Sequence, residues 1–376
     1  MGTVCTKDKC SGCMACKAVC PKDAIEIKDE VRVFNSYMNE RKCIKCGRCK
    51  KICPLNKLPK LMPPIEWMQG WSKDQDIRAR SSSGGAASEL MRSFIASGGY
   101  VCSCVFEHGE FGFEVTNNIE RAKQFAGSKY VKSNPDGIYE EIEDLLKKGK
   151  KVLFIGLPCQ SAGLRNTIPE RLQEQLYRVD LICHGTPSYS LLNKHINELG
   201  YKFDEIENIS FREKNRWRLV VTHNGKENTV LNLYLLGYLS GYFYTENCYE
   251  CPYAGINRVS DITIGDSWGS NLRDELKAGL SLIICQTEKG IKLIRDSNLH
   301  IESVDQEKAI VANQQLRHPY ERTEKTSKFY NHYLRTKRFG MSFFMTKPML
   351  VVKQHVKYIL YKLRLYKPPK SGGGID

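Results

Sequence analysis

Residues 10–21 have the sequence CSGCMACKAVCP, and residues 43–54 have the sequence CIKCGRCKKICP. Both stretches contain four cysteines separated by two, two and three residues, and both end in proline. Equivalent cysteines of the two stretches differ in residue number by 33 (43 − 10). This repeat predicts a small cysteine-rich module with internal pseudo-symmetry over residues 1–60.

The spacing of the cysteines indicates which metal they bind. The pattern C-x2-C-x2-C-x3-C-P is typical of bacterial ferredoxins with two [4Fe–4S] clusters, in which the fourth cysteine of each run ligates the other cluster. Structural zinc is the alternative, but zinc ribbons use separate C-x2-C pairs, so the spacing favours iron. We expect one cluster to be held by Cys10, Cys13, Cys16 and Cys53, and a second by Cys20, Cys43, Cys46 and Cys49.

The chain as a whole has the composition of a globular protein. Of its 376 residues, 41% are hydrophobic and 26% are charged, which excludes a wholly disordered chain. It contains no apolar run of roughly 18 residues and no signal-peptide pattern, so we expect a cytoplasmic protein. In a reducing cytoplasm its 16 cysteines are metal ligands or catalytic groups more often than disulfides.

The formal charge of +15 is concentrated near the end of the chain. Residues 325–370 contain twelve Lys or Arg and no Asp or Glu, so the rest of the chain carries only +3 (15 − 12). No aromatic-stacking or groove-reading motif accompanies these charges. We therefore expect no nucleic-acid partner.

The basic segment also contains a predicted helix that begins near Pro348. Its apolar stripe consists of Val352, Val356, Ile359, Leu360 and Leu363, and the residues that flank the stripe are Lys353, Lys357, Lys362 and Arg364. This pattern predicts a basic amphipathic helix that lies on the inner face of an anionic membrane or docks on a partner. A C-terminal helix packed on the protein's own core is the alternative.

From residue 80 onward the pattern changes to alternating helices and strands. We expect helices over residues 86–95, 138–148 and 160–167, and strands over residues 152–155, 179–182, 262–265 and 281–285. Strand, helix and strand at this spacing imply βαβ units in a parallel or mixed sheet. The predicted fold is therefore a small ferredoxin domain followed by a mixed-sheet α/β domain, an α+β or α/β protein overall.

A serine- and glycine-rich loop precedes the first of these helices. Ser81, Ser82, Ser83, Gly84 and Gly85 offer backbone amides and hydroxyls to a phosphate, although such a loop is often only a turn and helix cap. Lys129, Lys132 and Ser133 could reach the same pyrophosphate. Iron–sulfur clusters carry single electrons, whereas most organic substrates take an electron pair, and a flavin is the usual converter. We therefore expect FAD as a cofactor.

Four further cysteines occupy suggestive positions. Cys159 and Cys183 follow predicted parallel strands and so lie at the same edge of the sheet, and Cys248 and Cys251 form a C-x2-C pair. Together they suit a third [4Fe–4S] cluster, with zinc or buried core cysteines as the alternatives. His184 is a candidate proton donor, or a turn residue that orders Cys183.

These segments occur in a specific order along the chain. They are RSSSGG at residues 80–85, GSKYVKS at 127–133, GLPCQ at 156–160, CHGTPS at 183–188, FREK at 211–214, Trp217, CYEC at 248–251 and DITIGDSW at 261–268. The succession resembles the coenzyme F-420 hydrogenase/dehydrogenase beta-subunit family, preceded here by a two-cluster ferredoxin.

The resemblance implies an FAD-containing iron–sulfur oxidoreductase in which Ser83, Gly84 and Gly85 line the flavin. It also implies that Cys159, Cys183, Cys248 and Cys251 hold a cluster near the flavin, and that Arg212, Lys214 and Asp266 lie on the substrate side. The expected organisation is a ferredoxin domain over residues 1–60, a linker over 61–79, a flavin-binding part over 80–175, a second part over 176–320 and a basic tail over 321–376.

The sequence therefore predicts an oxidoreductase with three [4Fe–4S] clusters and FAD. Electrons would pass between a ferredoxin-like partner protein and a small organic substrate or a deazaflavin-type coenzyme. The alternative is a non-catalytic electron-transfer subunit that docks on a partner enzyme, for example in polysaccharide biosynthesis.

Overall fold

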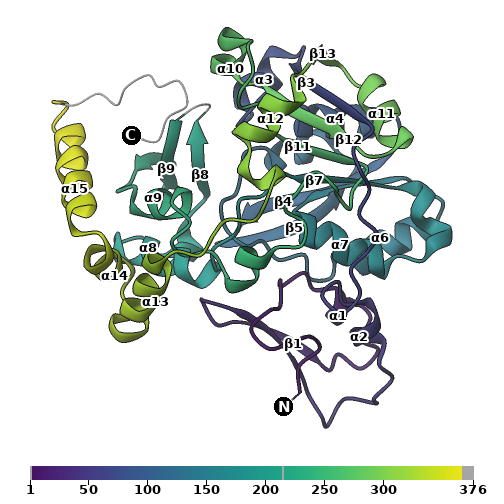
Figure 1. Cartoon of the computed structure of the whole chain (residues 1–376), viewed down its shortest axis with the longest axis horizontal. Coiled ribbons are helices and arrows are strands. Elements are labelled where there is room, and N and C mark those ends of the chain that lie inside the picture. The colour runs from purple at the N-terminus through teal and green to yellow at the C-terminus, as the bar shows by residue number, and fades with distance from the viewer. Residues whose placement is uncertain (1, 214–215, 366–376) are drawn as a thin grey trace.

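The computed structural model describes residues 2–213 and 216–365, so Lys214 lies outside the described residues (Figure 1). The described chain has three parts: an N-terminal module, an eight-stranded sheet covered by helices, and an aromatic region that contains a three-stranded sheet. Within residues 2–213 and 216–365, no helix has the length and apolar character needed to span a membrane.

The N-terminal module contains α1 (Ala15–Ala18), β1 (Ile25–Asp29), β2 (Phe34–Met38) and α2 (Arg48–Ile52). The two helices start at Ala15 and Arg48, which is the offset of the sequence repeat (48 − 15). Left-handed backbone recurs at the same offset, with φ of 63° at Gly12 and 57° at Lys45, and of 62° at Met14 and 72° at Gly47. The predicted pseudo-symmetry is therefore present in the backbone.

The central sheet has the strand order β13-β3-β12-β11-β7-β6-β4-β5. Its strands are β3 (Glu66–Ser72), β4 (Tyr100–Glu107), β5 (Glu110–Thr116), β6 (Val152–Gly156), β7 (Leu176–Leu181), β11 (Ile262–Asp266), β12 (Ser281–Cys285) and β13 (Leu299–Ser303). The four strands β4, β6, β7 and β11 are parallel, whereas the outer pairings are antiparallel. The predicted mixed sheet is thus confirmed.

Helices cover both faces of the sheet. The side chains of β6 therefore alternate between two apolar cores, one on each face. Leu153 and Ile155 pack with α4 (Ala86–Ala96) and α11 (Glu288–Arg295), whereas Val152 and Phe154 pack with α6 (Ile138–Lys147) and α7 (Pro158–Thr167). The shorter elements are α3 (Gln75–Arg80), α5 (Ile119–Ala122), α10 (Arg273–Ala278) and α12 (Gln306–Ala312), with 3-10 turns at η1 (Lys123–Phe125), η2 (Glu170–Gln175), η3 (Phe203–Glu205), η4 (Glu246–Glu250) and η5 (Gln314–Leu316).

The segment expected to be a linker is largely structured. Residues 66–72 form β3, which pairs with β12 on one side and β13 on the other and buries Met68 and Gln69. Because both pairing partners lie far later in the sequence, no local pattern indicates this strand. The expected boundary at residues 175 and 176 divides two parts that share one sheet, since β6 and β7 are neighbours.

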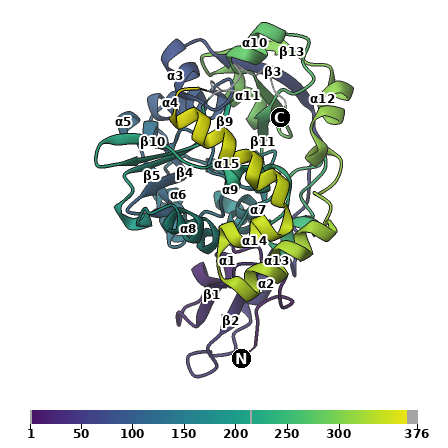
Figure 2. The same ribbon diagram turned by 90° about the vertical axis from the view of Figure 1, so that its left-hand side faces the viewer.

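The aromatic region contains β8 (Asn208–Glu213), β9 (Arg216–His223), β10 (Lys226–Thr229), α8 (Tyr189–Glu198), α9 (Leu233–Leu239), α13 (Glu324–Thr336), α14 (Phe339–Thr346) and α15 (Pro348–Lys362). Phe329, Phe339 and Phe343 from α13 and α14 are fully buried in its core. The segment expected to be a basic tail from residue 321 therefore begins as part of the core. The helix that follows, α15 (Figure 2), exposes the apolar side chains of Met349, Val352, Val356, Ile359 and Leu363.

The module is fixed to the rest of the molecule by polar contacts on several elements. Asp29 accepts hydrogen bonds from the hydroxyls of Ser188 (2.7 Å) and Ser190 (3.1 Å) at the start of α8. Arg32 pairs with Glu246 at 2.5 Å. The module is therefore held in a fixed position, below the central sheet in the view of Figure 1.

Candidate functional site

The structure brings the second predicted set of module cysteines together. Cys20, Cys43, Cys46 and Cys49 line one small pocket at the outer end of the module. Burial raises the pKa of the Cys49 thiol, and the thiols of the other three raise it further. These four side chains are the set that the ferredoxin pattern assigned to one cluster.

The first predicted set lies deeper. Cys10, Cys13, Cys16 and Cys53 are all buried. Burial raises the pKa of the Cys16 thiol, and the nearby thiols of Cys13 and Cys53 add to the increase. Cys5 is not part of the cysteine pattern in the sequence, but it packs in the same small core as Cys10, Cys16 and Cys53. Its pKa is raised to about 11, and hydrogen bonding with Cys10 is the largest cause.

Each half of the repeat directs one backbone amide at a cysteine sulfur. The N–H of Gly12 donates to Cys10 Sγ, and the N–H of Lys45 donates to Cys43 Sγ, both at 3.4 Å. The left-handed backbone at these two positions turns the amides toward the sulfurs. Such hydrogen bonds help to set the reduction potential of an iron–sulfur cluster.

The four scattered cysteines also converge. Cys159 lies in the first turn of α7, directly after β6, and Cys183 follows the parallel neighbour β7. Burial is the largest cause that raises the pKa of Cys183, followed by the thiols of Cys248, Cys159 and Cys251. Cys159 and Cys183 therefore lie at the carboxyl edge of the parallel strands, and Cys248 and Cys251 lie near Cys183.

Within residues 2–213 and 216–365, no three His, Cys, Asp or Glu side chains are grouped closely enough to hold a single metal ion. A cubane places one thiolate at each of four iron atoms, so its ligands stand around a cluster and not around one ion.

The first set and the scattered set are adjacent through α7. A Cβ added at Gly163 would lie 3.2 Å from Cys13 Sγ, which shows how closely the module approaches this helix. Burial raises the pKa of Cys13 to about 12, and the thiol of Cys159 contributes to the increase. Cys159 and Gly163 are one helical turn apart, on the same side of α7.

A buried cation lies at this junction. Lys132 is 6% exposed, and its Nζ donates to Cys159 Sγ at 3.2 Å. Its Cε would lie 3.4 Å from a Cβ at Gly12 of the module. The adjacent Ser133 accepts hydrogen bonds from Gln160 of α7. Of the two expected pyrophosphate ligands, Lys132 therefore contacts Cys159, and Ser133 contacts the next residue of α7, Gln160.

The glycine loop lies at the N-terminus of α4. The hydroxyl of Ser82 accepts a hydrogen bond from the N–H of Ser128 (2.9 Å), so the two segments expected to bind the flavin do meet. Gly84 has a structural role, since an added Cβ would lie 2.4 Å from the carbonyl oxygen of Gly70. Gly85 has φ of 86° and caps the helix.

The hydroxyls of Ser81 and Ser83 donate to the carbonyls of Ile77 and Leu280, at 2.8 and 2.9 Å. Lys129 Nζ donates to the carbonyls of Phe125 and Ala126. The first-turn amides of α4 have no acceptor within the helix, so these amides suit a phosphate.

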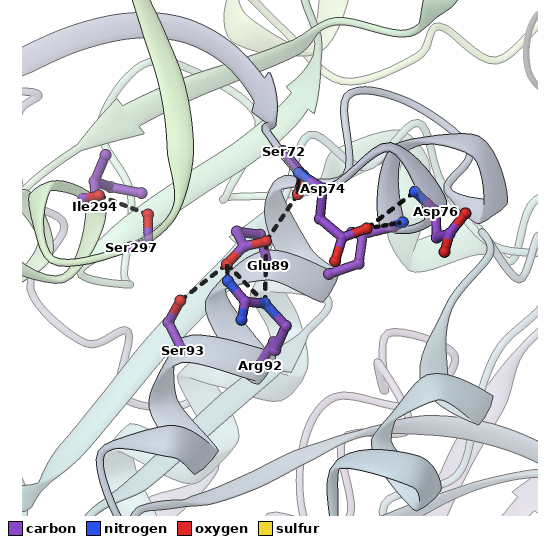
Figure 3. A network of polar contacts seen from close by, with 9 residues as sticks. Ser72, Asp74, Asp76, Glu89, Arg92, Ser93, Ile294 and Ser297 are labelled. Carbon is purple, nitrogen blue, oxygen red and sulfur yellow. Dashed lines mark hydrogen bonds and ion pairs between the residues drawn. The ribbon is translucent and has the colours of Figure 1, made fainter.

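A buried carboxylate anchors the helix behind this loop (Figure 3). Glu89 is fully buried and accepts hydrogen bonds from Ser72 (2.7 Å), Ser93 (3.0 Å) and Arg92 (2.6 Å). Ser72 is the last residue of β3, and therefore the network ties the first turns of α4 to the sheet.

Arg212 and Asp266 form a bidentate ion pair, with N–O distances of 2.7 and 3.0 Å. The guanidinium lies over the rings of Trp217 and Trp268, at 5.0 and 5.8 Å from their centroids. The ring of Tyr130, which sequence reasoning missed, is 5.0 Å from that of Trp217. Aromatic rings beside a fixed cation suit a flat, anionic heteroaromatic ligand.

His184 also faces this region. Its side chain is exposed to solvent, yet burial by surrounding protein lowers its pKa, and the charge of Asp266 acts in the opposite direction. His184 is thus near Asp266, which pairs with Arg212.

The strand register gives the order of these groups along the sheet edge. The glycine loop lies next to β3 and β12, Asp266 ends β11, Cys183 follows β7 and Cys159 follows β6. Neighbouring strands are about 4.8 Å apart, so the loop and Cys159 are separated by three to four strand spacings, roughly 14–19 Å. A separate pocket of about 390 Å³, beside β1, contains none of these residues.

Comparison with known proteins finds matches for two segments of this chain. Residues 149–307 match the family described as the C terminus of the coenzyme F420 hydrogenase/dehydrogenase beta subunit, and residues 9–57 match the "4Fe-4S dicluster domain" family. A subunit of the F(420)H(2) dehydrogenase of Methanosarcina mazei is 25% identical over 286 residues, which cover 70% of this chain and 78% of that protein.

Among solved structures, one of the F420-reducing [NiFe] hydrogenase complex from Methanosarcina barkeri contains a similar chain. Its TM-score is 0.49 at 16% identity, with 74% of this chain and 96% of that chain covered. The family matches confirm the resemblance seen in the motifs. This chain therefore carries an N-terminal 4Fe–4S dicluster domain joined to a domain of the coenzyme F420 hydrogenase/dehydrogenase beta-subunit family.

Proposed function

We propose that this chain is an iron–sulfur flavoprotein oxidoreductase that exchanges electrons between a protein carrier and a small organic substrate or deazaflavin-type coenzyme. Its twelve predicted ligand cysteines would hold three [4Fe–4S] clusters, and the glycine loop would hold FAD. Bound FAD would supply the conversion between single electrons and electron pairs.

The observation that carries this proposal is the spatial order of the thiols. The pocket formed by Cys20, Cys43, Cys46 and Cys49 is outermost, the buried set that includes Cys13 follows, and Cys13 adjoins Cys159 through α7. From Cys159 the sheet edge leads past Cys183 to Asp266 and the glycine loop. An isolated structural metal site would not need such a continuous series.

The remaining residues have roles that follow from their positions. Amides at the start of α4, with the hydroxyl of Ser82, would bind a phosphate of the cofactor. Arg212 and the rings around it would orient a planar ligand, and Asp266 keeps that guanidinium in place. His184, whose imidazole is influenced by the charge of Asp266, would hold or release a proton in the same region.

The matched family and the name of the Methanosarcina mazei relative both refer to coenzyme F420. They support a deazaflavin coenzyme as the first substrate to test. That relative is also named as a subunit, which supports the second candidate: an electron-transfer subunit that is active only with a partner enzyme.

The C-terminal helix supports a peripheral membrane contact. Met349, Val352, Val356, Ile359 and Leu363 follow one another at intervals of three or four residues, and each is between 48% and 80% exposed. The opposite side of α15 packs inward through Val351, and Tyr358 donates a hydrogen bond to the carbonyl of Thr229. The apolar stripe faces solvent. It does not pack on the protein's own core, as the alternative interpretation of this helix would require.

The charges beside this stripe favour an anionic lipid surface. Lys353 and Lys357 lie on one side of the stripe and Lys362 on the other, and no acidic residue occurs in α15. A second copy of the helix would bring like charges together, whereas anionic headgroups would pair with them.

The oxidoreductase proposal can be tested on anaerobically purified protein by optical spectroscopy. Dithionite should bleach a flavin band, and addition of oxidised deazaflavin coenzyme should restore it with stoichiometric reduction of the coenzyme. The variant Asp266→Asn, which removes one charge of the pair with Arg212, should keep its flavin but reoxidise more slowly. A protein with a full iron content that retains no flavin would contradict the proposal. Reoxidation only in the presence of a partner enzyme would establish the subunit version instead.

A further inference from the structure

The outer end of the module differs from its inner end in exposure. Cys46 is exposed and Cys20, Cys43 and Cys49 are half-buried, whereas the four cysteines of the first set are all buried. Solvent, or a protein that arrives from solvent, therefore approaches the second set before it approaches the first.

This outer end is strongly basic. Residues 40–58 contain seven Lys or Arg and one acidic residue, which gives a net charge of +6 (7 − 1). The chain outside residues 325–370 carries +3 in total, so without this outer end it carries −3 (3 − 6). The seven basic side chains are all exposed: Arg41, Lys42, Lys45, Arg48, Lys50, Lys51 and Lys57.

Apolar side chains are exposed between these charges. Ile44, Leu55 and Leu58 are 57%, 37% and 47% exposed, and Ile44 lies between Cys43 and Lys45. Transient protein interfaces combine a few apolar contacts with a charged, solvated rim. We name the surface formed by residues 41–58 the outer basic face.

We propose that the outer basic face docks an acidic one-electron carrier protein and that electrons enter the chain there. In each encounter the reduced carrier would lose one electron, which would pass to the cluster that Cys20, Cys43, Cys46 and Cys49 are proposed to hold. Two encounters would provide the electron pair that reduces one molecule of substrate, and the substrate would take up its protons from solvent. This inference rests on the proposed function, because it requires clusters in the module.

Charge complementarity distinguishes this partner from others. The positive face would steer a negative carrier toward the exposed Cys46, and such steering raises association rates by about 10- to 1,000-fold at low ionic strength. The same attraction is screened as salt is added, since the Debye length falls to about 10 Å at 0.1 M. The rate of electron entry should thus depend on both charge and salt.

The experiment is anaerobic stopped-flow reduction of the full-length holoprotein by a small acidic [2Fe–2S] ferredoxin, with dithionite as the comparison reductant that needs no protein docking. The test variant reverses two charges of the outer basic face, Lys51→Glu with Lys57→Glu. The control variant makes the same change elsewhere on the surface, at the exposed Lys194 of α8 and Lys226 of β10, both to Glu.

At low salt the test variant should be reduced by ferredoxin roughly tenfold more slowly than the wild type, a drop within the range of electrostatic steering. The control variant should stay within about twofold of the wild type, and the wild-type rate should fall as salt is added. An unchanged rate in the test variant, or a wild-type rate that is independent of salt, would overturn the proposal. If dithionite itself reduces no cluster in the wild type, the proposed function fails instead, so the two failures are distinguishable.

Discussion

Lys132 should raise the reduction potential of any cluster bound through Cys159. Its ammonium is buried and donates to Cys159 Sγ at 3.2 Å. Reduction adds one negative charge to a cluster, and a fixed positive charge beside a ligand sulfur stabilises the reduced form more than the oxidised form. Replacement by a neutral side chain of similar length, Lys132→Met, should therefore make the cluster harder to reduce.

The size of the shift follows from the strength of this contact. A hydrogen bond to a charged group contributes about 1.5–3 kcal/mol. Since about 1.4 kcal/mol is a tenfold change in an equilibrium constant and a tenfold change is about 59 mV for one electron, the potential should fall by roughly 60–130 mV. A point-charge calculation gives an upper bound near 4 kcal/mol at about 4 Å in a medium of dielectric about 20.

The assay is an EPR-monitored redox titration of the anaerobically purified protein. Lys132→Arg keeps the charge and should stay near the wild-type potential. Lys129→Met is the matched control, because Lys129 Nζ donates only to backbone carbonyls in the described contacts. Equal potentials in Lys132→Met and the wild type, with equal iron contents, would refute the argument that this lysine faces a cluster.

Three other results are expected. Gly84→Ala should destabilise the protein by roughly 1–3 kcal/mol and lower its flavin content, because the new Cβ would lie 2.4 Å from a carbonyl oxygen. Gly112 has open space around it, so the control Gly112→Ala should leave the free energy of unfolding nearly unchanged in a denaturant titration. Burial lowers the pKa of His195 to about 4, so the unfolded chain takes up a proton that the folded chain does not, and stability should fall by about 2 kcal/mol between pH 7 and pH 5. His195→Gln should remove that fall, and an identical pH dependence in both proteins would show that this histidine is not responsible. Val356→Glu should abolish co-sedimentation with vesicles that contain anionic lipid, while binding of the wild type to purely zwitterionic vesicles at the same level would contradict the role of the lysines beside the stripe.

Parts of the molecule with strong local signals were predictable from the sequence. The cysteine spacing predicted a pseudo-symmetric module, which the recurring left-handed backbone shows. The helix over 86–95, the strand over 152–155 and the helix over 138–148 correspond to α4, β6 and α6 within one or two residues. Short apolar runs bounded by turns and amphipathic helices carry their own periodicity, so one sequence suffices to find them.

Features that depend on distant partners were not predictable in this way. The strand β3 pairs with β12 and β13, and no sequence pattern near residues 66–72 indicates that pairing. The direction of the Lys132 side chain depends on where the module docks against α7, which no spacing along the chain encodes. The exposed stripe of α15 has the same helical period as a buried one, so only tertiary structure shows which side faces solvent.

The central claim is that four thiols far apart in the sequence, at residues 159, 183, 248 and 251, hold a third cluster between the module and the sheet edge. The most direct test is the iron and acid-labile sulfide content of anaerobically purified wild type and Cys251→Ser, read together with their EPR spectra after reduction. Three cubanes require about twelve irons per chain in the wild type, and the variant should lose up to about four of them together with one EPR signal. About eight irons in the wild type, with no change in the variant, would contradict the claim.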